Sequence, residues 1–131
     1  MKRGAPDHPK MDALAEALGI ELWGAVGLME CLWHFTAKFA PAGDIGKYSN
    51  WQIANKLGWQ GDPSALMQAL VNAHFVDHDD QHHYIVHDWS QHCEDAVQRE
   101  LARKGQRFAD GKKPNIARLK KNSYYLPRRY V

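Results

Sequence analysis

The sequence has few of the features that identify disulfide-rich, membrane-spanning or secreted proteins. It contains two cysteines in 131 residues, Cys31 and Cys93, and no Cys-x-x-Cys pair, so no disulfide framework is expected. No apolar run approaches the roughly 18 residues that a membrane-spanning helix needs. The N-terminus has no apolar segment of the kind found in signal peptides. We therefore expect a soluble, cytoplasmic protein that makes no contact with a membrane.

Catalytic motifs are missing as well. The sequence has no Gly-x-Ser-x-Gly nucleophile elbow, no phosphate-binding P-loop and no Gly-x-Gly-x-x-Gly motif. Histidines, carboxylates and Cys93 gather between residues 77 and 93, and zinc accepts these ligand types. However, no pair among them has the spacing that puts two ligands on one side of a helix or knuckle. We expect no enzyme activity, no cofactor and no metal.

Positive charge is scarce in most of the chain and concentrated at one end. Residues 1–95 hold six Lys and Arg against 13 Asp and Glu, a formal charge of −7. Residues 96–131 hold 11 against two, a formal charge of +9. A basic segment of that density is typical of contact with a polyanion, most often nucleic acid. The alternative is a solvated cationic segment without a partner.

Apolar periodicity predicts two helices in the first third of the chain. After an irregular arm over residues 1–9, a short helix over residues 11–18 is expected to end at Gly19. A longer helix over residues 21–39 is expected to end before Pro41, because proline cannot continue a helix.

The longer helix is apolar on two sides, which is typical of a central, buried helix. We therefore interpret Cys31 as a core thiol, and Gly24 and Gly27 as places where a neighbouring element approaches closely. We assign the five tryptophans of the sequence to core packing rather than to base stacking.

Two short helices are predicted in the middle of the chain. Residues 44–47 are long enough only for a small edge strand. Ser49 followed three residues later by Gln52 is a capping box, which predicts a two-turn helix that ends at Gly58. A second helix is predicted over residues 63–74, with proline at its first position.

A hairpin and a last helix complete the predicted elements. Residues 75–76 and 84–86 are strand-like runs around a polar stretch, which predicts a β-hairpin. A helix is expected over residues 90–108, before Gly111. Its expected inner face is formed by Cys93, Ala96, Val97 and Leu101.

The predicted fold class is mainly α with a small β-hairpin, an α+β arrangement. Two short helices joined by a tight turn and followed at once by a hairpin have the element order of a winged helix-turn-helix. That domain would span residues 10–110, with residues 63–74 as recognition helix and His82 and His83 on the wing. Residues 111–131 would form a basic C-terminal tail. The alternative is an unrelated α+β domain with the same element order.

Four stretches of the sequence resemble the N-terminal winged-helix domain of phage replisome organisers, DnaD-like replication-initiation proteins of phages and prophages. The stretches are GLMECLW (27–33), APAGDIG (40–46), IANKLGWQGD (53–62) and VHDW (86–89). The resemblance extends over roughly residues 10–100. It implies binding of origin DNA and recruitment of replication proteins such as a helicase or its loader. No helicase-contacting domain follows here, so we expect a truncated relative or a domain reused for another purpose.

The predicted recognition helix offers Ser64, Gln68 and Asn72 as candidates to face DNA bases. Glutamine and asparagine can pair with adenine in the major groove. The helix contains no Lys or Arg. Met67 and Val71 are expected near the same outward side, where a protein partner or a second copy of the chain could dock. Base reading, a protein interface or homo-oligomer contact, and an ordinary solvated surface all remain open.

Candidate phosphate contacts are few in the body of the chain and frequent near its end. Arginines and lysines of the last helix recur at a spacing that makes one basic ridge, and tyrosines are interleaved with cations after it. The predicted partner is double-stranded DNA. The candidates are Lys47, Lys56, Arg99, Arg103, Lys104, Arg107, Lys112 and Lys113.

Overall fold

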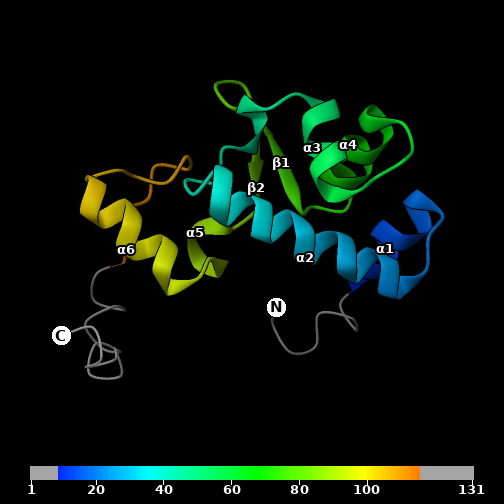
Figure 1. Cartoon of the computed structure of the whole chain (residues 1–131), viewed down its shortest axis with the longest axis horizontal. Helices are drawn as coiled ribbons and strands as arrows, with labels where there is room; N and C mark the ends of the chain where they lie inside the picture. The colour runs from blue at the N-terminus through cyan, green and yellow to red at the C-terminus, as the bar shows by residue number, and fades with distance from the viewer. Residues whose placement is uncertain (1–8, 116–131) are drawn as a thin grey trace.

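A computed structural model of the chain describes residues 9–115 (Figure 1). Within them, α-helices, one short 3₁₀ helix and a two-stranded antiparallel sheet follow one another, so the mainly helical α+β class is confirmed. Nearly all of the expected N-terminal arm and most of the expected tail lie outside the described residues. The elements are α1 (Pro9–Leu18), α2 (Leu22–Phe39), η2 (Ile45–Lys47), α3 (Asn50–Leu57), α4 (Pro63–Asn72), β1 (Val76–Asp79), β2 (His83–Val86), α5 (Trp89–His92) and α6 (Asp95–Lys104).

Helix α2 runs through the middle of the molecule, as its length and apolar composition predict. Helix α1 packs against it near one end, whereas α6 lies near the other end (Figure 1). One face of α2 is fully buried and includes Leu28, Met29 and Leu32. The other apolar side, which includes Leu22, Val26 and Trp33, is only partly covered, because Val26 and Trp33 are half-buried and Leu22 is exposed.

The expectations about Cys31, Gly24 and Gly27 are wrong. Cys31 is exposed. A Cβ atom at Gly27 would meet nothing within 4 Å, and one at Gly24 would meet only Ile20 of the preceding turn, at 3.8 Å. At these two glycines no neighbouring element packs against α2, and a groove lies there between α2 and the turn after α3.

The assignment of all five tryptophans to the core is also wrong. Trp89 is buried, and Trp33 and Trp59 are half-buried. Trp23 is 78% exposed and Trp51 is 65% exposed, because each lies on a helix face that is turned away from the core.

Local capping interactions fix the two short helices where the sequence predicts them. The Ser49 hydroxyl accepts from the Gln52 amide at 3.1 Å, while the Ser49 amide donates to the Gln52 side chain at 2.8 Å. Gly58 ends α3 in the left-handed conformation. The Asp62 carboxylate accepts from the Ser64 amide at 3.1 Å and caps α4. Helix α4 ends at Asn72, two residues earlier than predicted.

The predicted hairpin is present, whereas the edge strand expected over residues 44–47 is not. Strands β1 and β2 pair antiparallel, with Val76 opposite Val86. The preceding segment instead forms the 3₁₀ helix η2. Its link to the sheet is a single backbone bond, from the Val86 amide to the Gly43 carbonyl at 3.0 Å. Gly46 of η2 lies closely against the hairpin backbone, where a side chain would not fit.

The helix expected over residues 90–108 is broken into α5 and α6, because Cys93 and Glu94 adopt extended backbone angles. Gln98, only 1% exposed, joins the pieces. Its side chain donates to the Ser90 carbonyl at 2.8 Å and accepts from the Asn115 amide at 2.9 Å.

The expected inner face of that helix is correct except at one position. Cys93, Val97 and Leu101 are buried, but Ala96 is exposed. The break before α6 shifts the helix phase, so that Gln98 takes the buried place instead. Gly105, with a φ of 67°, ends α6 before Phe108.

Candidate functional site

Helix α4 presents the three predicted base-facing residues along one exposed face. Ser64, Gln68 and Asn72 are spaced four residues apart, and all three are exposed. The Gln68 side-chain amide donates to the Asn72 side-chain oxygen at 3.0 Å. This bond orders two amide groups side by side, with further donors and acceptors directed to solvent. The helix contains no Asp or Glu, so nothing within it repels a polyanion.

Met67 does not lie on that exposed face, contrary to the prediction. It is 0% exposed, and Val71 is half-buried. The reason is that α4 packs against both α1 and α3, which bury a wider arc of the helix than one neighbour would. The outward side of α4 is therefore polar. Of the two apolar residues expected to receive a protein partner there, Met67 is buried and Val71 is half-buried.

The hairpin tip carries the two predicted wing histidines. The Asp79 carboxylate accepts from the backbone amides of Gln81 and His82, at 3.0 and 2.8 Å, and so shapes the turn. His83 is exposed and has a φ of 67°, whereas His82 is half-buried. The tip packs against η2, so part of the proposed wing is covered by the chain itself.

Two of the predicted phosphate contacts lie beside a shared aromatic cluster. The Lys56 ammonium lies over the Phe39 ring at 5.3 Å, and the Lys47 ammonium lies over the Tyr48 ring at 5.6 Å. The Tyr48 hydroxyl donates to the Phe39 carbonyl at 3.2 Å. The structure therefore brings cations of η2 and α3 to one side of the molecule.

The remaining cations are separate from α4. Arg99 and Arg103 are exposed on α6, at the other end of α2 from α4 (Figure 1). The predicted continuous ridge is wrong in two respects. Lys104 is paired with Glu100 at 3.1 Å. Arg107 lies beyond the end of α6 and donates to the Gly111 carbonyl at 3.1 Å. Lys112 and Lys113 are exposed after it.

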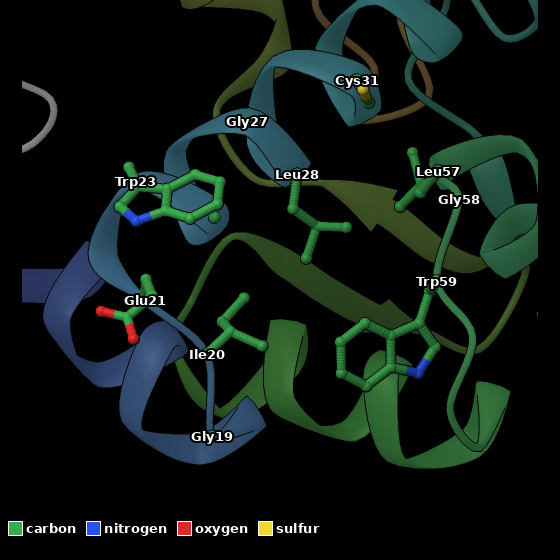
Figure 2. A pocket seen from close by; sticks show the side chains of 11 residues that line it. Gly19, Ile20, Glu21, Trp23, Gly27, Leu28, Cys31, Leu57, Gly58 and Trp59 are labelled. Atoms are coloured by element: carbon green, nitrogen blue, oxygen red, sulfur yellow. The ribbon is translucent and has the colours of Figure 1, made fainter.

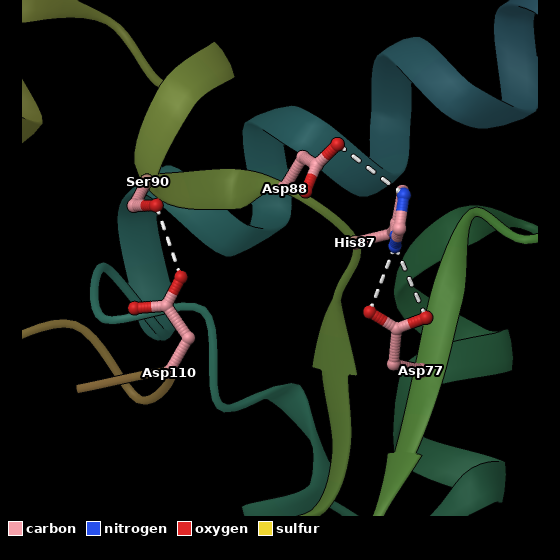
Figure 3. Close-up of polar contacts among 5 residues, drawn as sticks. All are labelled: Asp77, His87, Asp88, Ser90 and Asp110. Atoms are coloured by element: carbon pink, nitrogen blue, oxygen red, sulfur yellow. Dashed lines mark hydrogen bonds and ion pairs between the residues drawn. The ribbon is translucent and has the colours of Figure 1, made fainter. Parts of the chain in front are cut away.

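A polar cluster lies where β2 ends (Figure 3). His87 Nδ1 lies 2.9 Å from a carboxylate oxygen of Asp77, and its Nε2 lies 3.3 Å from Asp88. Burial lowers the pKa of Lys10, while the charges of Asp88 and Asp77 act in the opposite direction. Among residues 9–115, no three His, Cys, Asp or Glu side chains have the geometry of a metal site.

A groove that the sequence analysis missed lies between α2 and the turn after α3 (Figure 2). Its volume is about 460 Å³, and it is lined by residues 19–21, by α2 from Trp23 to Cys31, and by residues 57–59. Trp23 and Trp59 stand at its sides, and Leu28 points into it (Figure 2). The signal in the sequence was the pair of glycines after Trp23, Gly24 and Gly27. We interpreted them as places of close helix packing, but their lack of side chains leaves the groove open.

Comparisons of the chain with family models, curated proteins and solved structures give no match. None of the helices within residues 9–115 combines the length and apolar character needed to cross a lipid bilayer. Function must therefore be inferred from the arrangement of the side chains themselves.

Proposed function

We propose that the chain is a DNA-binding module of the winged helix-turn-helix type, with α4 as its recognition helix. The observation that carries the proposal is the exposed face of α4, where Ser64 and an ordered pair of side-chain amides lie in one row without a carboxylate among them. Asparagine and glutamine amides in such a row match the donor and acceptor pattern of adenine in the major groove.

The arrangement around α4 supports this use of the helix. Helices α3 and α4 pack on each other across a connection of five residues, 58–62, and the hairpin follows α4 directly. An α-helix with its side chains is about 10–12 Å across, which fits a major groove about 12 Å wide, and α4 is about 15 Å long. In this proposal α3 holds α4 in place, and Lys56 and Lys47 contact phosphates beside it.

Electrostatics predict weak and strongly salt-dependent binding by the body of the chain. Residues 9–115 hold ten Lys and Arg against 14 Asp and Glu. Phosphate neutralisation supplies most non-specific affinity. The cations of α6 and the basic segment after it would therefore add affinity without adding sequence preference.

The biological setting that we propose, initiation of phage-type DNA replication, rests on the resemblance of the four sequence stretches. In that setting a helicase or its loader would be a partner. The alternative, in which α4 docks on a protein or on a second copy of the chain, loses support because Met67 is buried.

Isosteric carboxylates on α4 test the proposal without disturbing the fold. Gln68→Glu with Asn72→Asp puts two negative charges on the face proposed to enter the groove. We expect affinity for a random-sequence duplex to fall about tenfold or more at low salt, because each charge repels nearby phosphates. Fluorescence anisotropy of the full chain with a labelled duplex, at several salt concentrations, measures the effect.

The matched control makes the same change of charge outside α4 and away from the cations of α6. Ala13→Glu with Ala17→Glu alters two exposed residues of α1, also four positions apart. It should weaken binding much less than the α4 pair. An equal loss in both variants would mean that overall charge, not α4, determines binding. No binding by the unmodified full chain at low salt would overturn the proposal itself.

A further inference from the structure

The groove beside α2 is present in the chain without a bound partner, and its lining is mostly apolar. The Trp59 indole donates to the Asp62 carbonyl at 3.2 Å and lies directly over Gly61, where a Cβ atom would meet the ring at 2.9 Å. One side of the groove is therefore fixed by local contacts. On the other side, Trp23 is 78% exposed, and a Cβ atom on Gly27 would meet nothing within 4 Å. An exposed indole at the edge of an apolar groove offers a surface on which another segment can dock.

The groove has a carboxylate in its lining, Glu21, and no Lys or Arg. Residues 9–37 hold one cation, Lys10, against four carboxylates. A segment that binds here should therefore combine apolar or aromatic side chains with positive charge.

Residues 116–131 of the same chain have this composition. They contain five Lys and Arg, no Asp or Glu, and three tyrosines together with Leu126 and Val131. They follow Asn115, which is bonded to Gln98 of α6. Helix α2 is about 27 Å long, and 16 residues extended reach about 53 Å. The segment is therefore long enough to reach from α6 to the groove.

We propose that residues 116–131 dock into the groove between Trp23 and Trp59 of their own chain. Aromatic side chains of the segment would fill the space between the two indoles, and its cations would face Glu21. This inference does not require that the chain bind DNA. It predicts that the acidic end of the molecule holds its basic segment, so that any polyanion must compete for it.

Cys31 reports whether the groove is occupied, because it lies in the lining and is exposed, whereas Cys93 is buried. Alkylation of the full chain by N-ethylmaleimide, an uncharged reagent, is followed by mass spectrometry of the Cys31 peptide. If the segment occupies the groove for about two-thirds of the time, displacing it raises the alkylation rate about threefold. We expect that rise for Arg128→Glu with Arg129→Glu, and for Tyr124→Ser with Tyr125→Ser.

The matched control is Lys112→Glu with Lys113→Glu, which makes the same charge change before the docking segment begins. It should leave the Cys31 rate close to that of the unmodified chain. Salt at about 0.5 M, roughly three times physiological ionic strength, should raise the Cys31 alkylation rate of the unmodified chain and of this control, but not of the two variants whose segment is already displaced. Without added salt, equal rates in all proteins, or an equal rise in the control, would overturn the proposal. A rate that falls as protein concentration rises would overturn docking within one chain and indicate a second copy instead.

Discussion

Replacing Gly46 by alanine is expected to lower the free energy of unfolding by about 3 kcal/mol or more, a large part of the 5–15 kcal/mol typical of a small domain. A Cβ atom on Gly46 would overlap the His82 carbonyl oxygen and the Tyr84 amide nitrogen, and would lie 2.8 Å from the Cβ of His83. Two of these neighbours are hairpin backbone, which cannot rotate away as a side chain can. Either η2 or the hairpin must therefore move.

Urea unfolding followed by circular dichroism measures this change, and Gly27→Ala is its matched control. A Cβ atom at Gly27 would meet nothing within 4 Å, and alanine favours a helix over glycine. The control should therefore stabilise the chain by up to about 1 kcal/mol. If Gly46→Ala proved as stable as the unmodified chain, η2 would not be packed on the hairpin as the structure describes.

Local rules of the sequence predict the boundaries of α1, α2, α3 and α4 to within about two residues, because those boundaries depend on interactions within a few residues. The capping pair Ser49 and Gln52 is an example, since both of its hydrogen bonds span three residues. What the sequence does not predict is how wide a face each helix buries. Met67 is buried because α4 packs against two other helices, α1 and α3, and Cys31 is exposed because it lies in the lining of the open groove beside α2. Those facts depend on tertiary packing, to which helical periodicity is insensitive.

The break between α5 and α6 was missed for a related reason. The segment from Trp89 to Lys104 contains no glycine or proline, so nothing local predicts an interruption. The structure breaks the helix at Cys93 and Glu94, and the buried side chain of Gln98 bonds across the break to Ser90. A single long-range arrangement here overrides a favourable local helix sequence.

Two of the stretches that carry the family resemblance lie against each other in the structure. The Trp89 indole donates to the Pro41 carbonyl at 2.8 Å, and its ring covers Gly43, where a Cβ atom would lie 3.1 Å from it. The Gly43 carbonyl in turn accepts from Val86. The residues of APAGDIG and VHDW therefore join the end of α2, the hairpin and α5. Their contacts are structural, so binding of a partner should be sought on α4 and in the groove.

Trp89 is the centre of that junction, and its replacement by alanine should lower the free energy of unfolding by about 3–5 kcal/mol. Trp89→Phe keeps most of the ring but leaves the Pro41 carbonyl without its donor, which should lower that free energy by about 1–3 kcal/mol. Trp23→Ala removes an indole that is 78% exposed and should change it by no more than about 0.5 kcal/mol. Circular dichroism in urea ranks the three variants. An equal effect of Trp89→Ala and Trp23→Ala would show that the two indoles do not differ in burial. The expected order instead separates the tryptophan that holds the fold together from the one left available on the surface of the groove.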